Sequence, residues 1–269
     1  MRVHHLIAGV MHPPLVPRII CHVLLVEHPE GLVLVDAGVG RADLVDPRRL
    51  GPSRHLLRPE RDPSTTAASA VEALGFSTDD VRHIVLTHLD IDHVGGAADF
   101  PGATLHTTAD EWAAATVDTK LAEKARYSPV QWAHDPEVRT WEGEGDAWRH
   151  GLSGHEVLSG ITLVPLAGHT RGHAAVAVET DHDLLVHAGD AVFDASCFGA
   201  THVRDGSRLD PVRLLRAFER TMAIQPSRLR GNHEALAALD REPGVRVVNA
   251  HDERLFPPRL MSTGLRSTA

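Results

Sequence analysis

The chain has 269 residues, of which 42% are hydrophobic and 23% are charged, a composition typical of a globular protein with a well-buried core. Acidic residues outnumber basic residues by 36 to 27, and the resulting net charge of −9 argues against binding nucleic acid over a broad surface. No stretch approaches the roughly 18 consecutive apolar residues of a membrane-spanning helix. The 20 histidines stand out, because histidine is the commonest metal ligand in proteins.

Short apolar strands alternate with helical segments along the chain, which predicts a layered α/β protein. The predicted strands are Ile19–Glu27, Leu32–Asp36, His83–Thr87, Ala103–Thr107, Ile161–Pro165, Ala174–Glu179, Leu184–His187 and Val245–Val248. The first two should form a hairpin. The predicted helices run from a cap at Ser64 to about Leu74, from Glu111 or just before it, from Asp210 to Met222, and from Ser227 to Asp240. Residues 40–63, rich in Arg, Pro and Asp, predict a long surface loop.

Residues 109–159 predict a mostly helical insertion between two halves, roughly 1–108 and 160–269, of a single domain that spans 1–269. All four tryptophans and the single tyrosine, Tyr127, lie between residues 111 and 149. Large aromatic side chains tend to be buried, so these residues either pack the insertion onto the core or form the wall of a substrate pocket.

The N-terminal segment has no apolar core of a signal peptide, and the two cysteines, Cys21 and Cys197, belong to no paired motif. This pattern excludes a disulfide framework and argues against a cysteine-based zinc site. We therefore expect a cytoplasmic protein with a small-molecule substrate, and with neither nucleic acid nor membrane as a partner. A homodimer is left open.

The strongest chemical signal is the segment His88-Leu89-Asp90-Ile91-Asp92-His93-Val94-Gly95-Gly96, which follows a buried-type strand. Alternation along an extended loop would place His88, Asp90 and Asp92 on one side and turn His93 another way, so the loop can serve two cations. Three further clusters follow strands: 167–173 with His169 and His173, 185–190 with His187 and Asp190, and 249–252 with His251. Imidazole and carboxylate groups without thiolates suit Zn²⁺, Mn²⁺ or Fe²⁺.

The order and spacing of these motifs resemble those of the metallo-β-lactamase superfamily. HLDIDHVGG resembles its HxHxDH loop, GHTRGH its GHTxGH loop, HAGDAVF the strand with its bridging aspartate, and NAHD its closing histidine. The resemblance implies a four-layer αβ/βα sandwich, with two mixed sheets flanked by helices and a dinuclear metal site at one sheet edge.

The resemblance also implies a ligand set. His88, Asp90 and His169 would hold the first metal; Asp92, His93 and His251 would hold the second; Asp190 would bridge both. Residues expected around these ligands, or in the pocket, are Asp36, Thr87, His173, His187 and Phe193. Arg171 would meet an anionic substrate or lie at the surface, and His233 is expected to be solvated.

Asp90 departs from the family pattern, because most members have a histidine there. A third carboxylate makes the centre less Lewis-acidic, which keeps Zn²⁺ as the first expectation but favours Mn²⁺ or Fe²⁺ more than in a typical zinc member. It also leaves the alternative that the first metal site binds its ion only weakly.

The implied activity is a metal-dependent hydrolase in which a metal-bridged hydroxide attacks the carbonyl carbon of a small lactone or ester, with Asp92 as the catalytic proton carrier. The layout is most similar to N-acyl-homoserine lactonases, although Phe193 stands where these often have a tyrosine. The alternatives are a thioester hydrolase similar to glyoxalase II and a catalytically weak metal-binding member of the fold.

Overall fold

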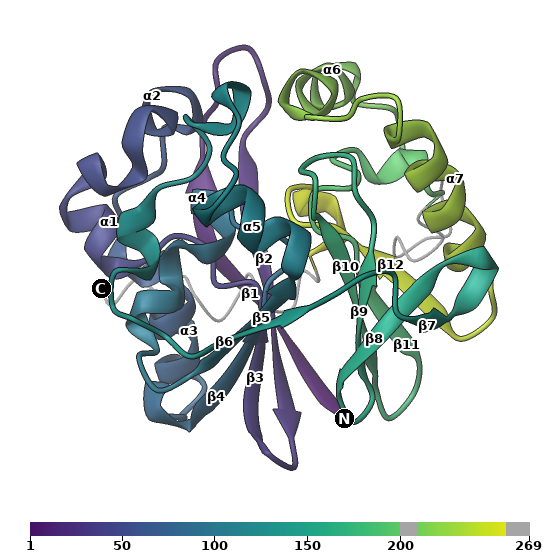
Figure 1. Cartoon of the computed structure of the whole chain (residues 1–269), viewed down its shortest axis with the longest axis horizontal. Helices are drawn as coiled ribbons and strands as arrows, with labels where there is room; N and C mark the ends of the chain where they lie inside the picture. The colour runs from purple at the N-terminus through teal and green to yellow at the C-terminus, as the bar shows by residue number, and fades with distance from the viewer. Residues whose placement is uncertain (200–208, 257–269) are drawn as a thin grey trace, which may run out of the picture.

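Two six-stranded mixed sheets form the centre of the computed structural model, which describes residues 1–199 and 209–256 (Figure 1). The strands are β1 Arg2–Met11, β2 Ile19–His28, β3 Gly31–Val35, β4 Val81–Val85, β5 Thr104–Thr108, β6 Val138–Trp141, β7 Asp146–Ala147, β8 Ser153–Leu158, β9 Ile161–Pro165, β10 Ala174–Glu179, β11 Leu184–His187 and β12 Val245–Val248. The helices are α1 Arg41–Val45, α2 Arg54–Leu57, α3 Ala67–Ala73, α4 Ile91–Val94, α5 Ala109–Thr116, α6 Arg213–Met222 and α7 Leu229–Asp240.

In both sheets, each strand lies beside the strand that follows it in the chain. The first has the order β1-β2-β3-β4-β5-β6, with antiparallel pairing up to β3 and parallel pairing beyond it. The second has the order β12-β11-β10-β9-β8-β7, in which only β11 and β12 pair in parallel. Because the parallel strands β3, β4 and β5 point the same way, the loops that follow them meet at one edge of the first sheet.

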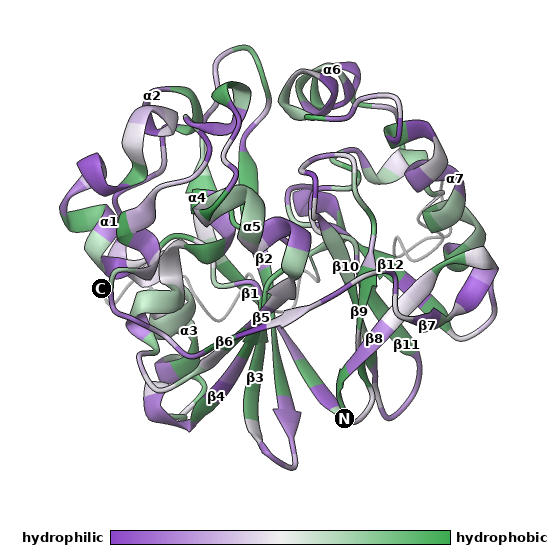
Figure 2. Ribbon diagram, viewed as in Figure 1, coloured by the Kyte–Doolittle hydropathy of each residue, from purple (hydrophilic) through white to green (hydrophobic). Residues whose placement is uncertain are grey.

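Three apolar clusters define four layers. One cluster joins the sheets through residues such as Val33, Val85 and Leu163. A second packs α3 and α5 on the outer face of the first sheet, and a third packs α7 on the second sheet. Strands such as β3, β9 and β10 accordingly appear as largely hydrophobic segments in Figure 2, whereas α6 mixes hydrophobic and hydrophilic residues. Two mixed sheets flanked by helices are the architecture that the sequence predicts.

Several predicted elements match the structure closely. The predicted hairpin is β2 and β3, and the last four predicted strands coincide with β9, β10, β11 and β12. Strand β4 begins and ends two residues earlier than predicted, and β5 one residue later. Helix α5 begins at Ala109, where the Thr108 side chain accepts a hydrogen bond from the Glu111 backbone N–H.

Other expectations were wrong at the level of local structure. Strand β1 was not predicted, because its sequence lacks a regular apolar alternation. The predicted loop 40–63 contains α1, α2 and a 3₁₀ segment. The cap of α3 is Thr66, which accepts from the Ser69 N–H, and Ser64 instead lies in the preceding 3₁₀ turn. Helices α6 and α7 begin at Arg213 and Leu229, later than predicted.

The mostly helical interpretation of residues 109–159 was also wrong. After α5 and two 3₁₀ turns, the segment forms β6, which extends the first sheet, and then β7 and β8, which start the second. Its tryptophans pack on the cores: Trp112 and Trp132 lie against the first outer cluster with ring centroids 5.9 Å apart, and Trp141 lies against the cluster between the sheets. The packing alternative therefore describes these aromatic residues.

Among the helices in the described ranges, none combines the length and the apolar character needed to cross a lipid bilayer.

Candidate metal centre

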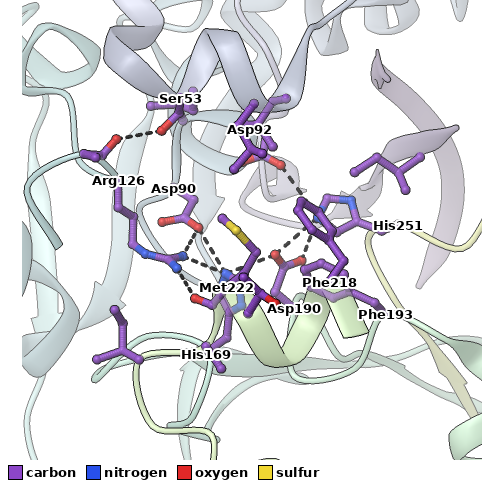
Figure 3. Close-up of a pocket in the computed structure, with 18 of the residues that line it drawn as sticks. Ser53, Asp90, Asp92, Arg126, His169, Asp190, Phe193, Phe218, Met222 and His251 are labelled. Carbon is purple, nitrogen blue, oxygen red and sulfur yellow. Dashed lines mark hydrogen bonds and ion pairs between the residues drawn. The ribbon is translucent and has the colours of Figure 1, made fainter. Parts of the chain in front are cut away.

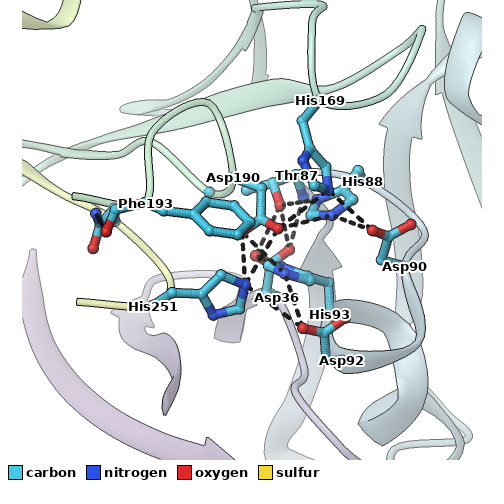
Figure 4. Close-up of polar contacts among 12 residues, drawn as sticks. Asp36, Thr87, His88, Asp90, Asp92, His93, His169, Asp190, Phe193 and His251 are labelled. Carbon is cyan, nitrogen blue, oxygen red and sulfur yellow. Dashed lines mark hydrogen bonds and ion pairs between the residues drawn. The ribbon is translucent and has the colours of Figure 1, made fainter. Parts of the chain in front are cut away.

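Seven buried histidine and aspartate side chains converge from four loops that follow, or connect, strands of both sheets (Figure 4). The loop after β4 supplies four of them, the β9–β10 connection supplies His169, and the segments after β11 and β12 supply Asp190 and His251. They form two groups whose potential ligand atoms lie within 4.8 Å of one another: His88, Asp90, His169 and Asp190; and Asp92, His93 and His251. These are the groups implied by the sequence resemblance.

The first group has the spacing of a coordination shell. The Oδ2 atom of Asp90 lies 3.3 Å from His88 Nε2 and 3.0 Å from His169 Nε2, and His169 Nε2 lies 3.2 Å from Asp190 Oδ2. Ligand atoms about 2.1 Å from a tetrahedral ion are about 3.4 Å apart. The observed separations therefore suit a single divalent cation.

The second group faces the other oxygen of Asp190. The Oδ1 atom of Asp190 lies 3.3 Å from His93 Nε2 and 3.1 Å from His251 Nε2. Asp92 Oδ2 lies 3.6 Å from His251 Nε2 and 3.8 Å from His93 Nε2. His251 Nε2 also lies 3.2 Å from Asp190 Oδ2, so the Asp190 carboxylate lies between the two groups, where a bridging ligand would lie.

The side chains of residues 88–93 are not divided between the two groups in the way that the alternation predicts. Asp90 has extended backbone and is the N-cap of the short helix α4, so the extended part of the loop ends there. Asp92 and His93 are consecutive residues of that helix and belong to the same group. Gly96 lets the helix approach closely, since a Cβ atom there would lie 2.2 Å from the carbonyl oxygen of Ala37.

Hydrogen bonds behind the ligands orient three of the four histidines. His93 Nδ1 lies 2.8 Å from Asp36 Oδ2, and His251 Nδ1 lies 2.8 Å from the carbonyl oxygen of Ile20. The Thr87 hydroxyl donates to Asp36, so it can accept from His88 Nδ1, 2.9 Å away. Protonation at Nδ1 leaves each Nε2 lone pair facing the centre, as metal-binding histidines require.

The other residues expected near the ligands have distinct positions. His173 Nε2 accepts from the backbone N–H of Asp190 at 3.0 Å and so fixes the bridging residue. His187 contacts the Gly189 N–H and the carbonyl oxygen of His22, and is buried behind the centre. Phe193 covers the ligands, with its ring centroid 4.8 Å from that of His251.

The electrostatics of the centre depend on burial and on close opposite charges. Burial raises the pKa of Asp92. Burial also acts to raise the pKa of Asp90, but the Arg126 guanidinium, with His88 and His169, overcomes this effect and holds that pKa well below its usual range. Burial opposes protonation of His93, but the carboxylates of Asp190 and Asp36 raise its pKa well above the usual value. A concentration of negative charge attracts cations to this position.

A cavity of about 370 Å³ opens above both groups (Figure 3). Its floor includes Asp90, Asp92, His169, Asp190 and His251, and its walls are mostly apolar. The apolar lining residues are Ile19, Leu56, Leu57, Ile91, Ala122, Ala125, Phe193, Phe218, Met222, Ala223 and Ile224. Of the five residues expected near the ligands, Phe193 is the one found among the described residues that line this cavity.

Comparison with known proteins identifies the family. Residues 16–226 match the family model of the metallo-beta-lactamase superfamily. The chain belongs to this superfamily. Probable metallo-hydrolases of Mycobacterium tuberculosis and Mycobacterium bovis are each 44% identical to it over 261 residues, which cover 95% of this chain and 82% of theirs.

More distant matches are lactonases. An N-acyl homoserine lactonase of Agrobacterium fabrum is 35% identical over 81 residues, or 30% of this chain and 31% of that protein. The solved structure of an N-acyl homoserine lactone hydrolase, with the product N-hexanoyl-L-homoserine at its catalytic metal centre, matches with a TM-score of 0.68. That match covers 97% of this chain and 95% of the other at 18% identity, so it shows a common fold.

The donor set fits the divalent ions that the superfamily fold implies. His88 Nε2, His93 Nε2 and Asp190 Oδ1 are buried and have no hydrogen-bond partner among the described residues. Leaving buried polar atoms unpartnered is costly, and a cation at each group would satisfy them. Nitrogen and oxygen donors suit Zn²⁺, Mn²⁺ and Fe²⁺ alike.

The sequence interpretation missed Glu111, which connects the ligand loops. Its Oε1 accepts from the backbone N–H of Leu89, and its Oε2 accepts from the Thr170 hydroxyl and the Gly172 N–H. The Tyr127 hydroxyl donates to the same carboxylate. The capping pattern at 108–111 identifies the helix start, but nothing in it indicates these distant partners.

Arg126 was missed as well, because it belongs to no motif, yet its guanidinium binds Asp90 at the cavity floor. By contrast, Arg171 is not among the residues that line the cavity and forms ion pairs with Glu123 and Asp118. The expectation that His233 is solvated was wrong: its Nε2 lies 2.6 Å from Glu219 Oε1, and its side chain is 24% exposed.

Proposed function

We propose that this protein is a metal-dependent hydrolase of small lactones or esters. The observation that supports the proposal best is the position of the two ligand groups: they share Asp190 and form the floor of an apolar-walled cavity. A carbonyl substrate seated in that cavity would lie directly above both groups.

The metal ions would supply the reactive chemistry. When bound, a pair of divalent cations lowers the pKa of water toward neutrality and polarises a carbonyl oxygen. His88, Asp90, His169 and Asp190 would hold one ion, and Asp92, His93, His251 and Asp190 the other. We propose Zn²⁺ as the first choice, with Mn²⁺ or Fe²⁺ favoured by the extra carboxylate of Asp90.

Asp92 is the residue that we propose as the proton carrier. Its carboxylate borders the cavity, and burial raises its pKa, which brings it closer to the range of a useful acid or base. In this role Asp92 holds the proton released by the attacking water and delivers it to the leaving oxygen. Hydrolysis then needs no side-chain nucleophile.

The cavity walls support an uncharged substrate. Leu57, Phe218 and Met222 line the space above the polar floor, where they exclude water and can contact an apolar part of the substrate. Phe193 covers the ligands but has no hydroxyl to donate to a carbonyl. The lactonase relatives therefore support lactone or ester hydrolysis in general, rather than homoserine lactones in particular.

A substrate panel tests the proposal. The purified protein, loaded with Zn²⁺, Mn²⁺ or Fe²⁺, is assayed with lactones, carboxylic esters and thioesters of matched acyl chains. We expect turnover of lactones or esters, with the ring-opened or cleaved acid as product. Selective turnover of thioesters, or full metal occupancy with no turnover of any substrate, would overturn the proposal.

A further inference from the structure

Arg126 reaches the first ligand group from the segment between the 3₁₀ turns Leu121–Glu123 and Pro129–Trp132. Its side chain is only 8% exposed, and its Nη2 atom donates to the backbone carbonyl of Met222. Its Nη1 atom donates to Asp90 Oδ2 and also lies 2.8 Å from His169 Nε2 (Figure 3). One guanidinium nitrogen therefore contacts two potential ligand atoms of the first group.

The chemistry of these contacts makes them incompatible with full metal coordination. A guanidinium has only donors, so in its contact with Arg126 the His169 Nε2 atom accepts through its lone pair. If Nε2 instead carries a proton, it donates to Asp90 Oδ2, 3.0 Å away, and again has no lone pair for a cation. An imidazole nitrogen has one such lone pair. It can accept the Arg126 hydrogen bond or coordinate a cation, but it cannot do both.

The second group has no corresponding cation among the described residues. The contacts of Asp92, His93 and His251 toward the centre are with one another and with Asp190. His93 Nε2 and Asp190 Oδ1 are buried without a hydrogen-bond partner in the described ranges. A cation entering this group displaces no side chain and satisfies both atoms.

We propose that Arg126 competes with the metal ion of the first group, so that the two groups bind metal with unequal affinity. The first cation equivalent enters the group of Asp92, His93, His251 and Asp190. The second equivalent enters the group of His88, Asp90 and His169 only when Arg126 gives up its contact with His169. This inference rests on metal binding at the proposed centre, but not on any particular substrate.

Asp90 provides a place for the displaced guanidinium. Its Oδ1 atom is buried and has no hydrogen-bond partner among the described residues, whereas its Oδ2 atom faces the other ligands. Arg126 can therefore remain paired with Asp90 through Oδ1 while Oδ2 coordinates the cation. The second metal then has to enter beside a permanent positive charge, which weakens its binding.

The test is a titration of the metal-free protein with Co²⁺, in which binding is monitored by calorimetry and by visible absorbance. It compares the wild type with Arg126→Met and with Arg49→Met as a matched control. Arg49 also pairs with a buried aspartate, Asp43, and donates to a backbone carbonyl, that of Val130, but it contacts none of the proposed ligands.

In the wild type and in Arg49→Met, we expect two binding events whose dissociation constants differ at least tenfold. In Arg126→Met, the weaker event should tighten at least tenfold, while the stronger event stays within about twofold. Two equal affinities in the wild type, or an unchanged weaker event in Arg126→Met, would overturn the proposal.

A second measurement uses only the wild type, in case Arg126→Met does not fold. Electron paramagnetic resonance after one equivalent of Co²⁺ should show one uncoupled high-spin species, with spin coupling appearing only during the second equivalent. Coupled Co²⁺ pairs at one equivalent would contradict unequal affinities of the two groups. Because neither readout involves turnover, an inactive substrate panel would reject the proposed reaction and leave this inference standing.

Discussion

Asp190 is the residue that both proposed ligand groups share, because its carboxylate lies next to histidines of each group. Its backbone N–H is held by His173, and the imidazoles around it are oriented by Asp36, Thr87 and the Ile20 carbonyl oxygen. Burial of so many titratable groups would be destabilising without partners. These side chains therefore depend on one another, because each is held in place by hydrogen bonds or ion pairs with its neighbours.

At the same scale, Asp92→Asn tests the proposed proton carrier. The amide keeps the shape of the side chain but cannot take up a proton, so kcat on the best substrate should fall about 100-fold. Steady-state kinetics at matched metal occupancy measures this effect. A decrease of less than threefold, with both ions bound, would show that Asp92 does not move the proton.

The ends of strands and one helix determine where the ligands lie. Strands β4, β11 and β12 each lead into a ligand loop, and α5 presents Glu111 between the loop after β4 and the β9–β10 connection. Because Glu111 is fully buried and binds both loops, it acts on the centre by positioning the loops that contain His88 and His169.

Glu111→Ala is therefore expected to lower the free energy of unfolding by about 2–4 kcal/mol, since it leaves several buried donors without an acceptor. Urea denaturation measures the change. The control is Glu72→Ala, which removes a half-exposed ion pair with Arg41 and should cost less than about 1 kcal/mol. Equal losses in the two variants would contradict the role given to Glu111.

The contact between α6 and α7 predicts a pH dependence. Burial alone lowers the pKa of His233, but its hydrogen bonds to Cys197 and Glu219 raise that pKa to about 10. The folded-state pKa then exceeds the unfolded value of about 6.5, so the stabilisation is complete below that pH and is lost as the pH rises toward 10.

His233→Gln should accordingly lower the free energy of unfolding by about 2 kcal/mol at pH 6 and by clearly less at pH 10. Urea denaturation of both proteins at pH 6, 8 and 10 gives the difference. A difference that stays constant across this range would contradict a charged His233 in the folded protein.

For the whole molecule, the sequence predicts the architecture and the ligand groups but not the connections that hold them. Residues that lie close together in the sequence, such as 88–93, indicate metal binding through their residue types and spacing. Arg126 and Glu111 act through partners dozens of residues away, and no local pattern encodes such pairs. Strands β6, β7 and β8 were missed for a related reason: they are short and partly exposed, so pairing with neighbouring strands, rather than apolar alternation, defines them.

The proposed ligands lie in segments that follow strands of both sheets, so bound metal should connect the two halves of the fold. A cation at 100 times its dissociation constant adds about 2.7 kcal/mol to the free energy of unfolding. Removing metal with a chelator should lower Tm by about 5 °C or more, and added Zn²⁺ should restore it. Calorimetry before and after chelation measures the shift; an unchanged Tm would mean that no ion connects the sheets.

The central claim is that hydrolysis by this protein requires metal at the centre built around Asp190. The most direct measurement is the turnover of a lactone or ester by the metal-free protein as metal is added in steps, with bound metal per chain measured in the same samples. We predict no turnover without metal, a rise that follows bound metal up to two equivalents, and loss on chelation. Turnover that persists in the metal-free protein, or that does not follow the bound metal, would contradict the account.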